Sequence, residues 1–149
     1  DNEITWFDWR GVEEHADLFR FVQGLLAFTQ WHPAFREEHF WTQNNGPPRI
    51  MWHGIKLDHP DWTHHSHSLA FGLHHPEGAA LHVMLNAYWD ALDFEIPADQ
   101  RWRRIVDTAR SAPDDFHSPD EAPFVTGHRY HVEARSTVIL MADNLHNSV

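Results

Sequence analysis

The sequence predicts a mostly β protein, an antiparallel β-sandwich preceded by one long helix. Two observations predict this fold. The stretch from about residue 14 to residue 31 carries good helix formers and no proline, whereas the chain beyond it consists of short runs of alternating apolar and polar residues. Proline, glycine, asparagine and aspartate separate those runs, as is typical of turns between antiparallel strands. A chain of 149 residues suffices for one domain, or for one domain and a piece of another.

The expected helix, which Pro33 ends, is apolar around most of its circumference. At about 100° per residue its polar residues fall on one narrow stripe: Glu13, Asp17, Arg20 and Gly24. Two apolar flanks lie beside the stripe, one made by Phe19, Val22 and Leu26, the other by Phe21, Leu25 and Phe28. A surface helix usually has a single apolar stripe and a wide polar face. We therefore expect this helix to be covered on two sides.

The expected strands are short, and several alternate clearly. Leu92, Phe94 and Ile96, for example, point to one side of their strand. The strands are expected at residues 49–53, 68–74, 80–86, 91–96, 102–107, 129–134 and 137–141. Their number and length favour a sandwich. Residues 108–126 are acidic and without periodicity, which indicates a long surface loop, and residues 143–149 are expected to be a frayed tail.

Composition excludes several classes of function. The chain has no cysteine, which rules out disulfides, thiol catalysis and cysteine zinc sites, and which fits a reducing, cytoplasmic location. Its net charge of −11 and the lack of a Lys/Arg cluster make nucleic acid and anionic membrane surfaces poor partners. No apolar run is long enough to span a bilayer. No signal-peptide pattern opens the chain, and no cofactor is expected.

Several segments resemble a known family. The segments "DNEITWFDW", "ADLFRFVQGLLAF" and "HPAFR" are similar to the end of the catalytic barrel in bacterial glycogen debranching enzymes, which are isoamylase-type members of the α-amylase superfamily. The segments "IMWHGIKLDHPDW", "HVMLNAYWDALDFEIP", "WRRIVDT" and "YHVEARSTVILMA" are similar to the C-terminal domain of the same enzymes. The resemblance runs in order over about residues 1–142, and "HSHSLAFGLHHP" most resembles the cyanobacterial-type branch.

The resemblance implies that the chain, which does not begin with Met, is a C-terminal fragment. Residues 1–36 would end a (β/α)8 barrel, with the helix at about 14–31 as its last, and residues 37–142 would form the β-sandwich C-terminal domain. The parent enzyme would hydrolyse α-1,6-glucosidic branch linkages in glycogen or another branched α-glucan. The sandwich would be non-catalytic, with its own catalytic barrel as its partner, and would stabilise that barrel.

Retaining glycosidases need two carboxylates about 5–5.5 Å apart. The resemblance places both upstream of Asp1, so we expect no catalytic residue in this chain and no activity from it. The acids that are candidates by residue type alone are expected to be solvated or capping: Asp8, Asp17, Asp61, Asp107, Asp114 and Asp115. Asp1 and Asn2 would be remnants of the substrate cleft, because loops after barrel strands line that cleft.

The stretch "HPDWTHHSHSLAFGLHH", at residues 59–75, is rich in histidine and raises the alternative of a His-rich metal-binding domain. On a strand His65 and His67 share a face, and a zinc site would need a further ligand, which Asp61 or His82 could supply. A polar loop leading into a strand, with histidines in ordinary hydrogen bonds, explains the same pattern, and we expect no metal.

Eight tryptophans raise a second alternative, a glucan-binding module. Trp62 and Trp89 lie in turn-like segments and are the rings expected to be exposed, where they could stack on sugar. Trp102 is expected in the core, while Trp6 and Trp9 would pack at the end of the barrel. Without the barrel, one apolar flank of the helix would lack a partner. We therefore expect the fragment to bury that flank in a homodimer.

Overall fold

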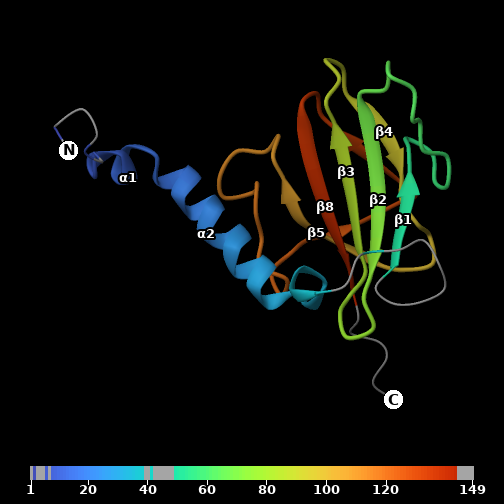
Figure 1. Ribbon diagram of the computed structural model, residues 1–149, viewed down its shortest axis with the longest axis horizontal. Helices are drawn as coiled ribbons and strands as arrows, with labels where there is room; N and C mark the ends of the chain where they lie inside the picture. The colour runs from blue at the N-terminus through green and yellow to red at the C-terminus, as the bar shows by residue number, and fades with distance from the viewer. Residues whose placement is uncertain (1, 3–5, 7, 39–40, 42–48, 144–149) are drawn as a thin grey trace.

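The computed structural model describes residues 2, 6, 8–38, 41 and 49–143. Among these residues it is mostly antiparallel β, with its helices at the N-terminus, which confirms the predicted fold class (Figure 1). The helical elements are α1 (Arg10–Glu14), α2 (Ala16–Trp31) and the 3-10 helix η1 (Pro33–Arg36). The strands are β1 (Arg49–His53), β2 (Ser68–His74), β3 (Leu81–Asn86), β4 (Leu92–Glu95), β5 (Trp102–Asp107), β6 (Phe124–Val125), β7 (Arg129–Val132) and β8 (Ser136–Ala142).

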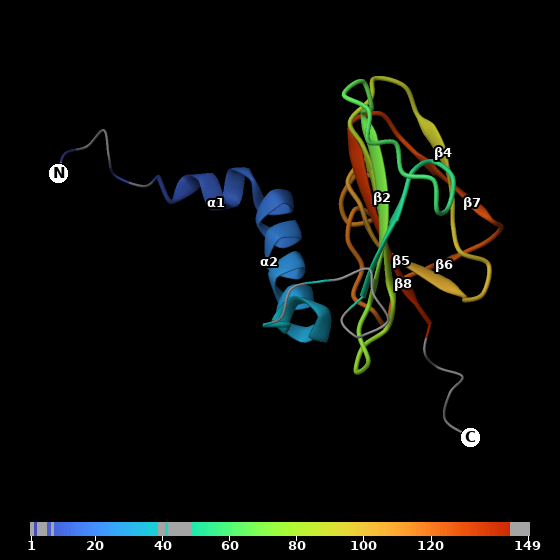
Figure 2. The same cartoon turned by 45° about the vertical axis from the view of Figure 1, so that its right-hand side comes forward.

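The strands form two sheets. The larger has six strands in the order β1-β2-β3-β8-β5-β6, and the smaller pairs β4 with β7. Every pairing is antiparallel, and the register between β5 and β8 shifts between Arg104 and Val106, which marks a bulge. Figure 2 shows α2 on one side of the large sheet and β4 with β7 on the other. The large sheet is therefore covered on both faces, each by a different kind of element.

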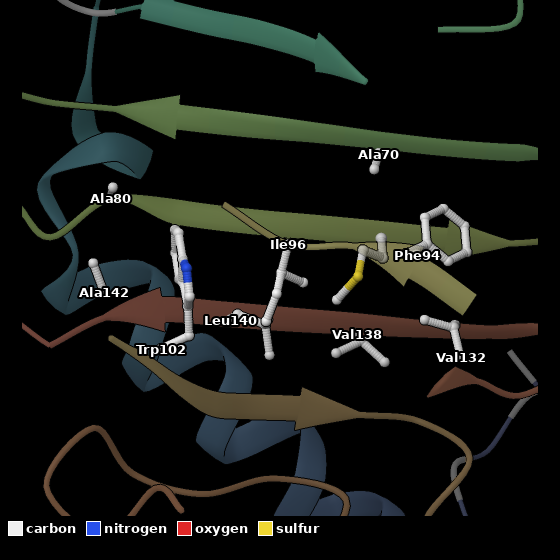
Figure 3. Packing of buried hydrophobic residues seen from close by; sticks show 10 residues of the cluster. Ala70, Ala80, Phe94, Ile96, Trp102, Val132, Val138, Leu140 and Ala142 are labelled. Carbon is white, nitrogen blue, oxygen red and sulfur yellow. The ribbon is translucent and has the colours of Figure 1, made fainter. Parts of the chain in front are cut away.

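The first hydrophobic core lies between the two sheets. Phe94 of β4 and Val132 of β7 are fully buried against Met84, Val138 and Leu140 of the large sheet. Figure 3 shows the labelled side chains of this cluster meeting between the strands, with Trp102 toward one end beside Ala80 and Ala142. The burial of Trp102, at 3% exposure, confirms the prediction that it belongs to the core. Its indole nitrogen donates to the Pro97 carbonyl at 2.7 Å, which satisfies the one polar group that this ring brings inside.

The second core lies on the opposite face of the large sheet, under α2. Phe28 is buried there with Leu81 and Ile105, and Phe21 and Leu25 of the same helix pack against this cluster. The flank formed by Phe21, Leu25 and Phe28 therefore faces the sandwich. The sequence alone left this choice between the two flanks open.

His32 fixes the end of α2 to the sheet. Its Nε2 donates to the Ala79 carbonyl at 2.9 Å, and its Nδ1 accepts from the backbone N–H of Ala34 at 3.2 Å. Ala79 lies in the turn between β2 and β3, and the Ala34 bond caps η1. The His32 ring is 1% exposed, and burial lowers its pKa below the usual histidine value. A neutral, doubly hydrogen-bonded imidazole therefore anchors the helix to the hairpin.

The helix expected at about residues 14–31 corresponds to α2. The short helix α1 precedes it and is separated from it at His15, whose φ of −119° and ψ of 38° are not helical. Two predictions of organisation need correction. Residues 108–126 are not a simple surface loop, because β6 forms within them and Phe116 and Ala122 pack into the second core. The expected frayed tail does not include Asp143. Its carboxylate accepts from Arg103 Nε at 3.1 Å and its side chain is 6% exposed. Residues 144–149 lie outside the described residues.

Candidate functional site

The two tryptophans proposed for glucan contact are exposed. Trp62 and Trp89 each have 64% of their surface open to solvent, as predicted. Trp62 packs edge-on against Trp52 of β1, with ring centres 5.5 Å apart, and Trp89 lies against Tyr88 at 4.4 Å. Each exposed ring is therefore supported by a second aromatic ring. The fold confirms the exposure of these two residues, and their contact with glucan stays a prediction.

Both tryptophans lie at the same end of the sandwich. Trp62 belongs to the loop between β1 and β2, and Trp89 to the loop between β3 and β4. Antiparallel pairing of Ser68 with Asn86 brings the ends of these loops together, and Ala87 donates from its backbone N–H to the His67 carbonyl at 2.8 Å. Figures 1 and 2 show both loops at the end opposite the β2–β3 turn.

A groove of about 200 Å³ lies between these two loops. Its polar lining comes from Asp61, His65, Ser66, His67, Ser68 and Tyr88, and its apolar lining from Ile55 and Leu92. The rings of His67 and Tyr88 are nearly parallel, at 18°, with centres 6.1 Å apart. Asp61 Oδ1 accepts from the Thr63 backbone N–H at 3.0 Å, which lowers the pKa of this carboxyl and keeps it ionised.

The three histidines weighed as metal ligands do not come together. His65 and His67 line the groove, whereas His82 is fully buried in β3. Asn86 pairs with Ser68 beside the groove, and His82 lies four residues further along β3, roughly 13 Å away at about 3.3 Å per residue. Within the described part of the chain no group of three or more His, Asp or Glu side chains is placed to hold a metal ion.

His82 instead belongs to a buried pair of imidazoles. The rings of His82 and His53 lie 5.6 Å apart on the face of the large sheet that the small sheet covers, next to Trp102. Burial, followed by the nearby His53, lowers the pKa of His82 to about 3. Burial also lowers the pKa of His53, against the opposing effect of Asp58. The sequence did carry a signal for this burial, because His82 alternates in step with Met84 and Asn86.

Among the acids, the structure contradicts the prediction made for Asp107. It was expected to be solvated or capping, but it is 5% exposed. Its Oδ2 accepts from Arg110 Nε at 3.1 Å and from the Tyr130 hydroxyl at 2.8 Å, while its Oδ1 accepts from the Ala109 backbone N–H. Burial, followed by the neighbouring carboxylate, raises the pKa of Tyr130. Asp107 is thus a buried structural carboxylate that links β5 to β7. Of the expected cleft remnants, Asn2 is exposed, and Asp1 lies outside the described residues.

The other candidate site is the outer face of α2, formed by Leu18, Phe19, Val22 and Leu26. These side chains are exposed, between 43% for Val22 and 62% for Leu18. Part of the polar stripe faces the domain instead, because Arg20 pairs with Asp115 and Gly24 lies against Phe116. The helix therefore turns apolar residues outward and some of its polar residues inward, which is the reverse of a solvent-facing helix. Trp6 and Trp9, expected to pack, are 66% and 77% exposed.

The described residues form a two-layer antiparallel β domain with one helix docked on it by a single flank. Comparison with known proteins identifies the family of this domain, since residues 51–145 match the family profile described as isoamylase 1-3, C-terminal. The chain belongs to the isoamylase family, and this part of it is the C-terminal domain of that family.

Several curated relatives are similar along most of the chain. Isoamylase 3, chloroplastic, of rice is 30% identical over 147 residues, which cover 95% of this chain and 18% of the rice protein. The glycogen debranching enzyme of Pectobacterium atrosepticum is 31% identical over 146 residues, which cover 95% of this chain and 19% of that enzyme. The isoamylase of Flavobacterium sp. is 27% identical over 161 residues, which cover 95% of this chain and 21% of that isoamylase. The chain thus spans about a fifth of the length of these relatives.

Proposed function

We propose that this chain is the non-catalytic C-terminal part of an enzyme that hydrolyses α-1,6-glucosidic branch linkages in a branched α-glucan such as glycogen. The relatives' names, isoamylase and glycogen debranching enzyme, support the reaction class. The catalytic carboxylates of the enzyme would lie in a barrel ahead of Asp1. In support, Asp107, a buried carboxylate of the sandwich, is engaged by Arg110 and Tyr130.

The observation that carries the proposal is the two-sided helix. One flank of α2, with Phe28 at its centre, is buried against the sandwich, while Phe19 and Leu26 on the other side are exposed. In the proposed enzyme α2 is the last helix of the catalytic barrel, and the barrel covers that outer face. Each such side chain stabilises by about 1.5–3 kcal/mol when fully buried. The sandwich would then stabilise the barrel by packing against the flank of α2 that faces away from it. The lack of cysteine supports a cytoplasmic enzyme.

Expression of the chain together with the coding sequence upstream of Asp1 tests this role. The longer protein should release linear chains from glycogen, and Phe19→Glu with Leu26→Glu should lower both its rate and its melting temperature. Ala98→Glu with Thr126→Glu adds the same two charges at exposed loop positions on the small-sheet side, away from α2, and is the matched control. A longer protein without debranching activity, or one whose rate and melting temperature do not respond to charges at Phe19 and Leu26, would refute the proposal.

A search of the described part of the chain finds no helix with the length and apolar character that a membrane span requires.

A further inference from the structure

We propose that the groove between the β1–β2 and β3–β4 loops is a binding site for a short linear α-glucan chain, separate from any catalytic cleft. The proposal rests on the proposed function only for the choice of an α-glucan among neutral oligosaccharides. The geometry itself supplies a polar groove between two loops, each of which carries an exposed tryptophan directly after a lining residue: Trp62 follows Asp61, and Trp89 follows Tyr88 and lies 6.3 Å from His67 between ring centres.

The aromatic faces are built to stay in place. Trp62 follows Asp61 of the groove, and its ring is held edge-on by Trp52, which in turn packs on Phe71 at 5.6 Å. On the other loop, Trp89 lies against Tyr88. Rings that are already ordered lose little conformational entropy on binding. Their exposed faces match the C–H face of a pyranose ring, which is flat and apolar.

The groove supplies hydrogen-bonding groups that its own neighbours leave free. Among the described residues none hydrogen-bonds to the ring nitrogens of His65 or His67. Asp61 accepts from the Thr63 backbone N–H through Oδ1 and also from the Thr63 side chain, and its two carboxylate oxygens keep further acceptor capacity for a ligand. A neutral imidazole offers one donor and one acceptor, and a carboxylate offers acceptors only. This mixture suits a ligand whose groups both donate and accept, as sugar hydroxyls do.

The charges favour a neutral ligand. Among the described residues that line the groove, Asp61 is the one acid and there is no Lys or Arg, and the whole chain carries a net charge of −11. An anionic ligand would be repelled both by Asp61 in the groove and by the net negative charge of the whole chain. A cation would find one carboxylate, and no group of three or more acidic or histidine side chains is arranged for a metal in the described residues. A neutral oligosaccharide remains, with the tryptophans as its stacking surfaces.

Isothermal titration of the 149-residue chain with maltoheptaose tests the site. The chain should bind, and Trp62→Ala and Trp89→Ala should each weaken binding by about tenfold, as expected for the loss of a principal aromatic contact. Trp9→Ala removes a ring that is at least as exposed but lies in the segment before α1, so it should leave binding unchanged. Near-ultraviolet circular dichroism confirms that each variant keeps its folded core.

Failure of the wild-type chain to bind maltoheptaose would overturn the site, as would full binding by both variants. Weaker binding in only one of the two variants would confine the contact to one loop and would overturn the proposal that the ligand lies in the groove between both loops. A change of oligomeric state in Trp62→Ala or Trp89→Ala would mark a protein interface instead and would also overturn it. None of these results bears on the release of linear chains from glycogen by the longer protein, so the proposed function stands or falls separately.

Discussion

Gly24 shows how closely α2 approaches the sandwich. A Cβ at this position would lie 2.6 Å from Cε1 of Phe116 and 2.7 Å from Cδ1. The Phe116 ring also packs edge-on against Phe21, with centres 6.3 Å apart, so it cannot easily move away. A glycine inside a helix normally costs about 1 kcal/mol relative to alanine. At this position the close approach outweighs that cost.

We therefore expect Gly24→Ala to destabilise the protein by about 1–3 kcal/mol, the usual cost of overpacking. Gly11→Ala is the control, because nothing lies within 4 Å of a Cβ built there. It should cause no loss. Urea denaturation followed by tryptophan fluorescence compares the two variants. Equal or greater stability for Gly24→Ala would show that the helix does not dock against Phe116.

The buried imidazole of His82 predicts sensitivity to acid. Its folded pKa is about 3, whereas an unfolded histidine titrates near 6.5. Below about pH 6.5 the unfolded chain therefore binds a proton that the native state excludes, and stability falls as pH falls toward 3. His82 alone should cost about 2 kcal/mol at pH 5 relative to pH 8.

His82→Leu should remove that part of the pH dependence, because leucine fills the apolar site without a titrating group. Urea midpoints at pH 8 and pH 5 measure the difference. His131→Gln is the control at an exposed histidine, whose pKa is raised by its hydrogen bond to Asp93. The His131→Gln variant should still lose stability between pH 8 and pH 5. A wild-type chain as stable at pH 5 as at pH 8 would mean that His82 is not buried and neutral.

At the residue scale, alternation and neighbouring turn residues were enough to predict the exposure of Trp62 and Trp89 and the burial of Trp102. The groove between the two loops could not be predicted, because it depends on the pairing of β2 with β3. The buried Asp107 was missed for a similar reason. Its partner Tyr130 lies on another sheet, 23 positions away in the sequence.

At the scale of elements, the outer face of α2 predicts self-association of the isolated chain. Phe19, Val22 and Leu26 present a row of exposed apolar side chains on one face. Soluble monomers rarely leave such a contiguous patch in water. We expect a two-fold dimer that buries this face at tens of micromolar chain. Light scattering coupled to size exclusion should show a dimer for the wild type and a monomer for Phe19→Glu with Leu26→Glu.

Ala98→Glu with Thr126→Glu is the control and should remain dimeric, because it adds the same two charges in exposed loops away from the outer face of α2. A monomeric wild-type chain with α2 still formed would contradict the prediction. The sequence predicted that the helix has two apolar flanks, since this follows from helical periodicity alone. It did not predict which flank docks. That choice depends on Phe116 and Asp115, which approach α2 from a loop distant in sequence.

At the scale of the whole molecule, the sequence predicted the antiparallel β class and nearly every strand. The division into a six-stranded and a two-stranded sheet was not predicted, because short strands with similar alternation do not specify their neighbours. The small sheet, β4 with β7, closes the first core on one face of the large sheet, and α2 docks on the opposite face. The molecule thus holds α2 by one flank and leaves Phe19, Val22 and Leu26 exposed on the other.

We infer that this domain supports a glycosidase without contributing a catalytic group. The decisive measurement is the release of reducing ends from glycogen by the purified 149-residue chain. We expect a rate equal to the blank, because the two carboxylates of a retaining glycosidase are expected outside this chain and Asp107, a buried acid of the sandwich, is held by Arg110 and Tyr130. Reducing-end release above the blank that Asp107→Asn abolishes would refute this role and would be evidence for a catalytic carboxylate inside the sandwich.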